Sequence, residues 1–163
     1  MTAASWTLRE AFVDNDRDVA ELAALRYDWR VGELGENGPS SEKFAQSLAS
    51  WWRGNAVSHV ALVGSVDDEA VAMAWLAIVE RVPSPTSPER RCGYVQSVYV
   101  RPQFRNRGIG HDVVAQLLAI AQARGLDYVA VHPTEKSFTF YQRLSFSPTS
   151  KVLELDFRVP VPS

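Results

Sequence analysis

The sequence predicts a mixed α/β (α+β) fold with a mostly antiparallel sheet, and two observations carry this prediction. Residues 59–66 and 70–80 are rich in β-branched and apolar side chains and are joined by a short charged turn, which is typical of an antiparallel hairpin. Residues 93–100 resume a strand, residues 109–124 place apolar side chains at helical spacing, and residues 127–131 form a short apolar run. Such a strand–helix–strand unit implies one parallel pair with a right-handed crossover.

The other elements follow from periodicity and from residues that begin or end helices. Trp6 to Phe12 alternates and predicts a first strand, after which Asp14 or Asp16 caps a helix. Ser40 or Ser41 caps the next helix. The rest of the chain is predicted as a mobile acidic loop over residues 32–39, a proline-rich connection over 81–92, a helix over 137–144 and a final strand over 152–157. The expected total is about six to seven strands flanked by about four helices.

The size and charge of the chain restrict its class. A chain of 163 residues fits one domain, 1–163, and 17 basic against 19 acidic residues give a net charge of −2, so no global positive field attracts nucleic acid or an anionic membrane. The single cysteine, Cys92, fits a reducing cytoplasm, and the three histidines are too scattered for a dedicated metal site. The longest apolar stretch, 70–79, is about half of a membrane span, and residues 1–10 lack the layout of a signal peptide.

The densest chemical signal runs from strand to loop to helix over residues 98–111. Gly108 and Gly110 allow the backbone to approach a ligand closely, the helix that begins there presents unpaired N–H groups, and Arg105 and Arg107 add positive charge. These features predict a site for a pyrophosphate. A Walker loop is excluded because the chain has no Gly-Lys pair, and a dinucleotide fingerprint is excluded because Val113 stands where it needs a third glycine.

Two blocks of this sequence resemble the GNAT superfamily of acyl-CoA-dependent N-acyltransferases. Arg105-x-x-Gly108-x-Gly110, preceded by Val98-x-Val100, is similar to the family's acyl-CoA motif, and residues 140–146, Phe-Tyr-Gln-Arg-Leu-Ser-Phe, are similar to its Phe-Tyr-x-x-x-Gly-Phe ending. The resemblance implies an N-acyltransferase-like fold in which the central strand splays from its neighbour. Ser145 departs from the family pattern, which has glycine there.

The resemblance also implies a cofactor site. The backbone at Val98 and Val100 would pair with pantetheine as though it were another strand, and the N–H group near Val98 would face the thioester oxygen. Thr134 stands where the family often has a CoA-contacting asparagine. The implied acetyl-CoA-binding residues are Val98, Val100, Arg105, Asn106, Arg107, Gly108, Ile109, Gly110, His111 and Thr134, and no metal is implied.

Acylation of an amine needs a general base and an acid for the departing thiolate. Tyr141 matches the family tyrosine near the sulfur and is the predicted acid. The family often carries the base at positions that are Tyr94 and Gln96 here, and neither is a good base at neutral pH. Glu80 is the favoured substitute. Glu33, Glu36 or a water molecule shuttled by Tyr94 are the alternatives.

The predicted function is therefore an acetyl-CoA-dependent N-acetyltransferase acting in the cytoplasm on a small-molecule or peptidyl amine. In the family the acceptor enters beside the first two helices, between Trp29 and Trp52 here, where Glu33 and Glu36 would favour a cationic amine. A CoA-binding sensor without catalysis is the main alternative. Nucleic-acid binding through the arginines at 101, 105 and 107 is disfavoured by the net charge, and no membrane partner is expected. Homodimers are frequent in the resembled family, so a homodimer is among the expected assemblies.

Overall fold

The structure is a computed structural model that describes residues 5–149 and 151–158. Its contacts divide the chain into two compact units, Met1–His132 and Pro133–Ser163. The first unit holds the sheet and the longer helices, and the second holds a short helix and the C-terminal segment. The two units are described separately below.

The first unit is built on one five-stranded sheet with the strand order β1-β2-β3-β4-β5. Neighbouring strands pair antiparallel except β4 and β5, which pair in parallel, so the predicted hairpin and the predicted crossover are both confirmed. The strands are β1 (Trp6–Ala11), β2 (His59–Val66), β3 (Glu69–Glu80), β4 (Arg91–Val100) and β5 (Tyr128–Val131). The described residues thus contain five strands, fewer than the six to seven expected.

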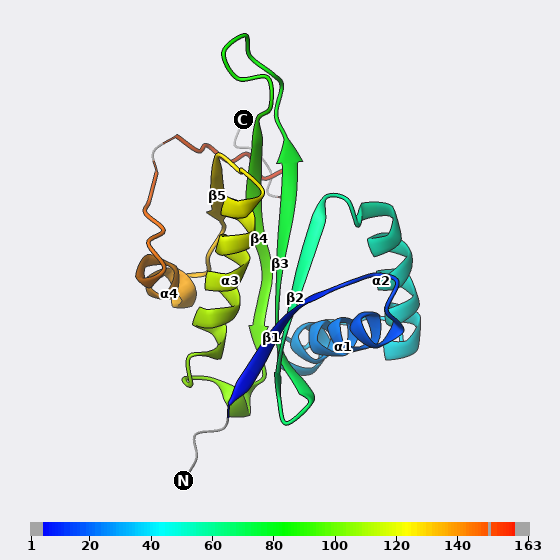
Figure 1. The fold of residues 1–163 in the computed structure, drawn as a ribbon. Helices are drawn as coiled ribbons and strands as arrows, with labels where there is room; N and C mark the ends of the chain where they lie inside the picture. Colours follow the sequence, from blue (N-terminus) through cyan, green and yellow to red (C-terminus); the bar gives the residue numbers. More distant parts are fainter. Residues whose placement is uncertain (1–4, 150, 159–163) are drawn as a thin grey trace. The chain divides into compact units, whose positions relative to one another are not determined.

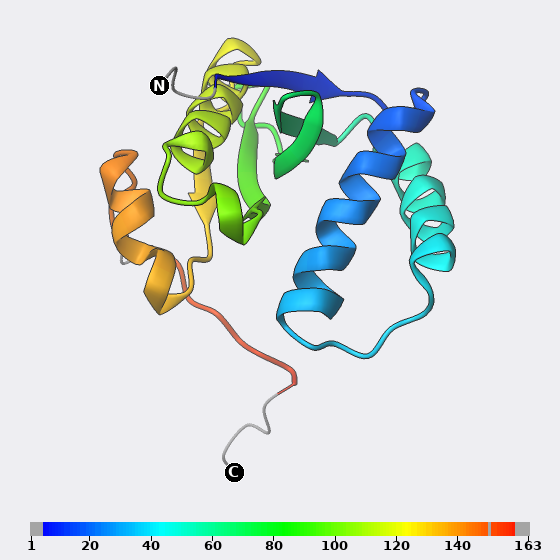
Figure 2. The same cartoon turned by 90° about the horizontal axis from the view of Figure 1, so that it is seen from below.

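Helices cover both faces of this sheet. The helices α1 (Asp16–Tyr27) and α2 (Ser41–Asn55) lie on one face, and α3 (Ile109–Ala123) lies on the other (Figures 1 and 2). A π-helical turn, η1 (Asp28–Glu33), continues directly from α1. Part of the segment predicted as a mobile loop is therefore helical. Figure 1 shows β3 and β4 running through the middle of the unit, next to the crossover helix α3.

Local hydrogen bonds explain where the first two helices begin. The side chain of Asn15 accepts hydrogen bonds from the N–H groups of Arg17 and Asp18, so Asn15 caps α1, and not Asp14 or Asp16. Ser40 caps α2 as predicted, because its hydroxyl accepts a hydrogen bond from the N–H of Lys43. Both caps satisfy N–H groups that have no partner inside the helix.

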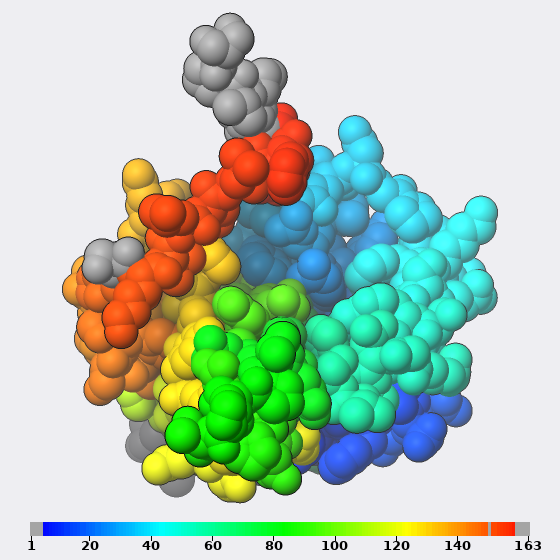
Figure 3. Space-filling model, turned by 90° about the horizontal axis from the view of Figure 1, so that it is seen from above, coloured from blue at the N-terminus to red at the C-terminus, as the bar shows by residue number. Residues whose placement is uncertain are grey.

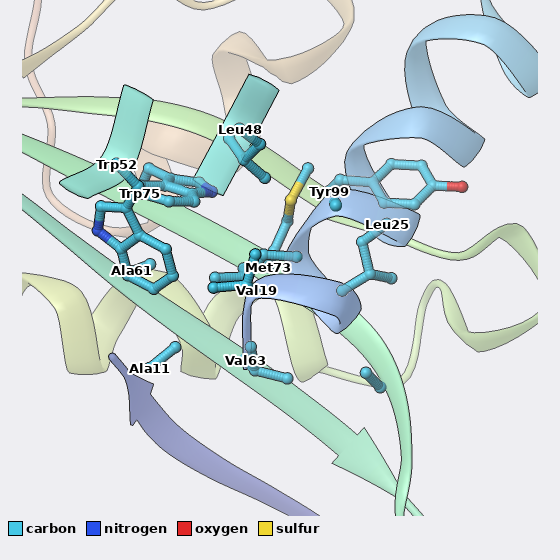
Figure 4. Packing of buried hydrophobic residues seen from close by; sticks show 13 residues of the cluster. Ala11, Val19, Leu25, Leu48, Trp52, Ala61, Val63, Met73, Trp75 and Tyr99 are labelled. Atoms are coloured by element: carbon cyan, nitrogen blue, oxygen red, sulfur yellow. The ribbon is translucent and has the colours of Figure 1, made fainter. Parts of the chain in front are cut away.

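The main core lies between the sheet and the α1–α2 pair. Trp52 of α2 packs edge-on against Trp75 of β3, with ring centroids 5.0 Å apart, and Met73 lies beside them on the same face (Figure 4). Trp52 is 2% exposed, whereas its neighbour Trp51 is 42% exposed. The other buried members of this cluster are Ala11, Val19, Leu22, Ala23, Leu25, Leu48, Ala61, Val63, Ala70 and Tyr99.

The connection between β3 and β4, residues 81–90, extends past the end of the sheet (Figure 1). It carries three prolines, and most of its residues are exposed; Figure 3 looks down onto it, where it appears in green. Ser84 and Ser87 exchange two backbone hydrogen bonds of 3.0 Å and close a small turn. The predicted connecting segment is therefore correct, although β4 begins one residue before its expected end.

The second unit contains η3 (Glu135–Ser137) and α4 (Phe138–Arg143). The N–H of Ser145 donates to the carbonyl of Gln142, and that of Phe146 donates to the carbonyl of Tyr141. These bonds close the helix with Ser145 at φ +68°, a left-handed conformation that glycine adopts without strain. This left-handed backbone explains why the family has glycine at this position. Serine adopts the same conformation at a small cost in free energy.

The final strand predicted over residues 152–157 is wrong, because the described residues 151–158 form no strand. The alternation of apolar and polar residues is present, but no neighbouring strand pairs with the segment. Leu153 is 96% exposed and Phe157 is 89% exposed. An alternating pattern marks a face suited to burial, and only hydrogen bonding to a second strand makes a sheet.

Candidate functional site

The central feature of the site is the end of β4, where its parallel partner stops. The β4–β5 pairing ends at Val95 and Val131, while β4 continues to Val100. Beyond Val95, the edge of β4 that faces β5 has no strand partner among the described residues. Such an edge offers N–H and C=O groups for pairing with an extended ligand. This edge lies where the sequence predicts that the central strands splay apart.

A β-bulge lies within this free section of β4. Met73 pairs with Tyr99 and Trp75 with Gln96, so Ser97 and Val98 together oppose the single residue Ala74. Ser97 has φ +51°. A bulge bends its strand and increases the local twist, and it turns the following side chains to the other face. It therefore reorients the backbone at Val98, where the sequence predicts contact with the thioester.

The loop after β4 leads into the N-terminus of α3. Gly108 caps this helix at φ +94° without a side-chain hydrogen bond, and the first helical bond is donated by Asp112 to the carbonyl of Gly108. The N–H groups of Ile109, Gly110 and His111 consequently lack partners inside the helix. A Cβ atom built on Gly108 would meet only the ring of Trp6, at 3.7 Å. Unpaired N–H groups and the helix dipole at this end suit an anion.

Arg105 and Arg107 of the loop make different contacts, Arg105 with other segments and Arg107 within the loop. The guanidinium of Arg105 donates to both carboxylate oxygens of Glu33, at 2.9 and 2.7 Å, and to the carbonyl of Val100 at 2.8 Å. It also lies over the ring of Tyr99, 5.6 Å from the centroid. Arg107 lies over the ring of Phe104 at 5.4 Å. Arg105 is thus held beside β4 and the loop, but its charge is balanced by Glu33.

The two loop glutamates expected to attract a cationic acceptor are both paired. Glu33 bonds Arg105, and Glu36 forms an ion pair with Arg30. Each carboxylate is therefore neutralised by a guanidinium next to it, which weakens the field that either one projects into solvent. The argument for a cationic acceptor loses its basis, and neither glutamate is a convenient proton acceptor in this arrangement.

The structure does not bring Glu80 to the free edge of β4. It is the last residue of β3 and lies opposite Arg91, whereas the bulge lies opposite Ala74, six residues away along the same strand. At a rise of about 3.3 Å per residue the separation is about 20 Å. Glu80 also lies on the α3 face, because it is in phase with Leu76 and Ile78, while Trp75 faces α1 and α2.

The free edge instead has a histidine beside it that sequence reasoning treated only as an unsuitable metal ligand. His132 directly follows β5, and its ring stacks on Tyr94 with centroids 6.4 Å apart and an interplanar angle of 10°. Tyr94 pairs with Ala77 and shares the face of the sheet that α1 and α2 cover. The sequence did offer one signal for His132: it directly follows the predicted strand that pairs with the strand before the phosphate loop.

In the second unit, Tyr141 is the one buried residue of α4, and its ring contacts Phe140 and Phe146 edge-on at 5.0 and 5.5 Å. Burial raises the pKa of Tyr141 to about 12. The phenol therefore keeps its proton at neutral pH, as a proton donor must. Thr134 precedes η3 without capping it, and its hydroxyl lies 3.0 Å from the hydroxyl of Ser137.

The raised pKa of Tyr141 predicts a loss of stability at alkaline pH. Below about pH 10 the phenol is neutral in the folded and unfolded chains alike. Between about pH 10 and the folded value of about 12, the unfolded chain ionises first, so the free energy of unfolding falls as pH rises. The Tyr141→Phe variant is expected to lack this part of the decline. Urea midpoints measured at rising pH for both proteins test it; parallel declines would contradict the assignment.

Comparison with known proteins places the chain in a family. The model of the acetyltransferase (GNAT) family matches residues 20–146, which begin inside α1 and end just after α4. The chain belongs to the GNAT family. A glucosamine 6-phosphate N-acetyltransferase of Trypanosoma brucei brucei is 31% identical over 74 residues, which cover 45% of this chain and 50% of that protein. The match thus spans about half the length of that curated relative.

Solved structures of proteins named as acetyltransferases have the same fold. A predicted acetyltransferase with acetyl-CoA from Clostridium acetobutylicum superposes with a TM-score of 0.74 at 20% identity, covering 94% of this chain and 97% of that one. An acetyltransferase of Trypanosoma brucei superposes with a TM-score of 0.71 at 26% identity, covering 94% of this chain and 100% of that one. The GNAT fold inferred from two short motifs is confirmed over nearly the whole chain.

The residues present in this GNAT chain fit acetyl-CoA. The unpaired edge of β4 suits the amides of pantetheine, and the open approach at Gly108 together with the free N–H groups of α3 suits a pyrophosphate. Within the described residues, no three His, Cys, Asp or Glu side chains gather as a metal site would require. None of the helices described is both long and apolar enough to cross a bilayer.

Proposed function

We propose that this protein transfers the acetyl group of acetyl-CoA to a primary amine of a small molecule. The observation that carries the proposal is the continuity of the free β4 edge with the unpartnered N–H groups of α3. Relatives named as N-acetyltransferases of glucosamine 6-phosphate and of aminoglycosides support a small amine as the acceptor. Both names describe amino sugars, which are therefore the first class to test. A homodimer and a cytoplasmic location remain predictions from the sequence.

In the proposed reaction, a bond forms between the amine nitrogen and the acetyl carbonyl carbon while the carbon–sulfur bond breaks. Acetyl-CoA supplies the activated acetyl group, and the products are an amide and the CoA thiol. The N–H near Val98, reoriented by the bulge, stabilises the negative charge that develops on the carbonyl oxygen. Tyr141 donates the proton that the sulfur needs, a role carried over from the family resemblance; its raised pKa keeps the phenol protonated at neutral pH.

His132 is the proposed general base in place of Glu80. It lies at the end of β5 where the free edge of β4 begins, and it stacks on Tyr94 on the face covered by α1 and α2. An imidazole is the side chain best suited to accept a proton near neutral pH. Glu80 lies about 20 Å along β3 from the bulge by strand rise, and on the other face.

The test of this function follows release of the CoA thiol from acetyl-CoA with glucosamine, glucosamine 6-phosphate and kanamycin as acceptors. We expect thiol release with at least one of them. The His132→Gln variant should lower kcat about a hundredfold without changing the KM for acetyl-CoA, whereas Glu80→Gln should keep wild-type kcat. The reverse order of effects would restore Glu80 as the base.

The alternative function, a CoA-binding sensor, predicts a different pattern. Calorimetry would then detect CoA binding while no acceptor released thiol and Tyr141→Phe changed nothing. The departures of this chain from the family pattern, Gln96 in place of a strand carboxylate above all, are what motivate this alternative. The imidazole of His132, which stacks on Tyr94 beside the same edge, is the observation that favours catalysis.

A further inference from the structure

Arg26 lies beside the bulge of β4 on the face covered by α1 and α2. It belongs to the last turn of α1, and its Nη1 donates to the hydroxyl of Ser97 at 2.6 Å. Its guanidinium also lies over the ring of Trp29, 5.9 Å from the centroid, and Trp29 stacks on Tyr99. Arg26 therefore lies within one hydrogen bond of the residue that precedes Val98.

The arginines around it are matched with carboxylates, and Arg26 is not. Arg30 pairs with Glu36, and Arg105 pairs with Glu33. Arg101 pairs with both Asp28 and Glu69. Among residues 5–149 and 151–158, no carboxylate lies within ion-pair distance of Arg26.

The environment of Arg26 disfavours an uncompensated positive charge. Its side chain is half-buried, and this desolvation, with the nearby charge of Arg30 second, lowers the pKa of the guanidinium; the charge of Glu36 opposes this shift and is the smallest of the three effects. Within the part of the chain that the structure describes, the guanidinium of Arg26 makes one hydrogen bond, to a neutral hydroxyl, although a guanidinium has five N–H donors. A half-buried cation with unused donors binds an anion favourably, because a carboxylate or phosphate supplies both the charge and the acceptors.

We infer that Arg26 binds an anionic group, phosphate or carboxylate, carried by the amine acceptor. The inference rests on the proposed function, which places the thioester carbonyl at Val98, next to Ser97. The pyrophosphate of CoA is assigned to the start of α3, so the anion at Arg26 belongs to the other substrate. This class of acceptor is the opposite of the cationic amine that Glu33 and Glu36 suggested in the sequence.

The first arm of the test compares acceptors that differ only in the anion. Glucosamine 6-phosphate against glucosamine tests phosphate, and lysine against lysinamide tests carboxylate. We expect kcat/KM to be at least about tenfold higher for the anionic member of one pair. In Arg26→Gln that preference should disappear through a higher KM for the acceptor that carries the anion, while the acceptor without it is unaffected; Arg26→Lys should restore part of the preference. Arg53→Gln, a charge loss at an exposed position of α2, is the control and should behave as wild type.

The second arm does not depend on turnover. With saturating CoA occupying the loop, calorimetry measures binding of inorganic phosphate and of acetate to wild type and to Arg26→Gln. We expect the wild type to bind one of these anions and the variant to bind it at least about tenfold more weakly. Equal binding of the anion by wild type and Arg26→Gln would overturn the role of Arg26. Equal losses of kcat/KM for both members of each acceptor pair in Arg26→Gln would overturn it as well. Thiol release without any preference for the anionic acceptor refutes this inference alone, whereas CoA binding without thiol release refutes the proposed function.

Discussion

Gly108→Glu is expected to abolish binding of CoA, with at least about a hundredfold loss of affinity, because the new carboxylate would lie where the helix N-terminus attracts the pyrophosphate. The space around Gly108 does not by itself forbid a side chain, since the ring of Trp6 lies at an ordinary contact distance from a Cβ atom built there. The loss should therefore come from charge and from occupation of the anion site. Isothermal titration with CoA measures it.

This substitution also strains the backbone, and the control must reproduce that strain. Gly108 has φ +94°, where any other L-residue costs about 1–2 kcal/mol, so a small loss of stability is expected as well. Gly125→Glu provides the match: Gly125 has φ +70° just beyond the other end of α3, and a Cβ atom there would approach only the guanidinium of Arg91, at 4.0 Å. Both variants should melt at lower temperature, but only Gly108→Glu should lose CoA. Unchanged affinity in folded Gly108→Glu, or equal losses in both, would refute the assignment of the loop.

The second large effect is expected in the core, where the adjacent tryptophans of α2 should differ sharply. Trp52→Ala should reduce the free energy of unfolding by about 3–5 kcal/mol, because it removes a ring buried against Trp75 and leaves a cavity between α2 and the sheet. Trp51→Ala, at the preceding position, should cost about 1 kcal/mol, since Trp51 is 42% exposed and its ring contacts His59 and Trp75 only by its edge.

Urea unfolding of the two tryptophan variants measures the difference. The transition midpoint should fall in Trp52→Ala with little change in the slope against urea, which would show that stability and not compactness has changed. Similar midpoints for both variants would mean that the buried position of Trp52 contributes no more than the exposed position of Trp51. Fluorescence of the remaining tryptophans and circular dichroism should report the same transition if unfolding is two-state.

Much of the fold could be predicted from the sequence because its signals are local. The hairpin, the crossover helix and the cap at Ser40 each depend on residues within a few positions of one another. The left-handed conformation at Gly108 agrees with the close approach predicted from that glycine. The prediction of a final strand failed because the alternation over residues 152–157 indicates only that one face of the segment is apolar. A strand also needs a partner to pair with, and periodicity does not reveal one.

The candidate site was harder to predict, because its important contacts join distant segments. Arg105 and Glu33 are 72 positions apart, and Arg26 and Ser97 are 71 apart, so neither contact leaves a pattern in the sequence. The bulge at Ser97 is equally invisible, since nothing in Gln-Ser-Val marks a left-handed residue inside a strand. Glu80 was favoured for its chemistry, and only the strand register shows its distance from the free edge.

The position of Cys92 has a practical consequence for following the reaction. It is the only cysteine in the sequence, and its side chain is buried in the second position of β4, opposite Val79 on one side and Tyr128 on the other. A thiol reagent added to the folded protein reacts with released CoA at once, and with Cys92 only when β4 opens. The same reagent therefore measures two rates in one sample: the proposed release of CoA, and the opening of the sheet at the start of β4.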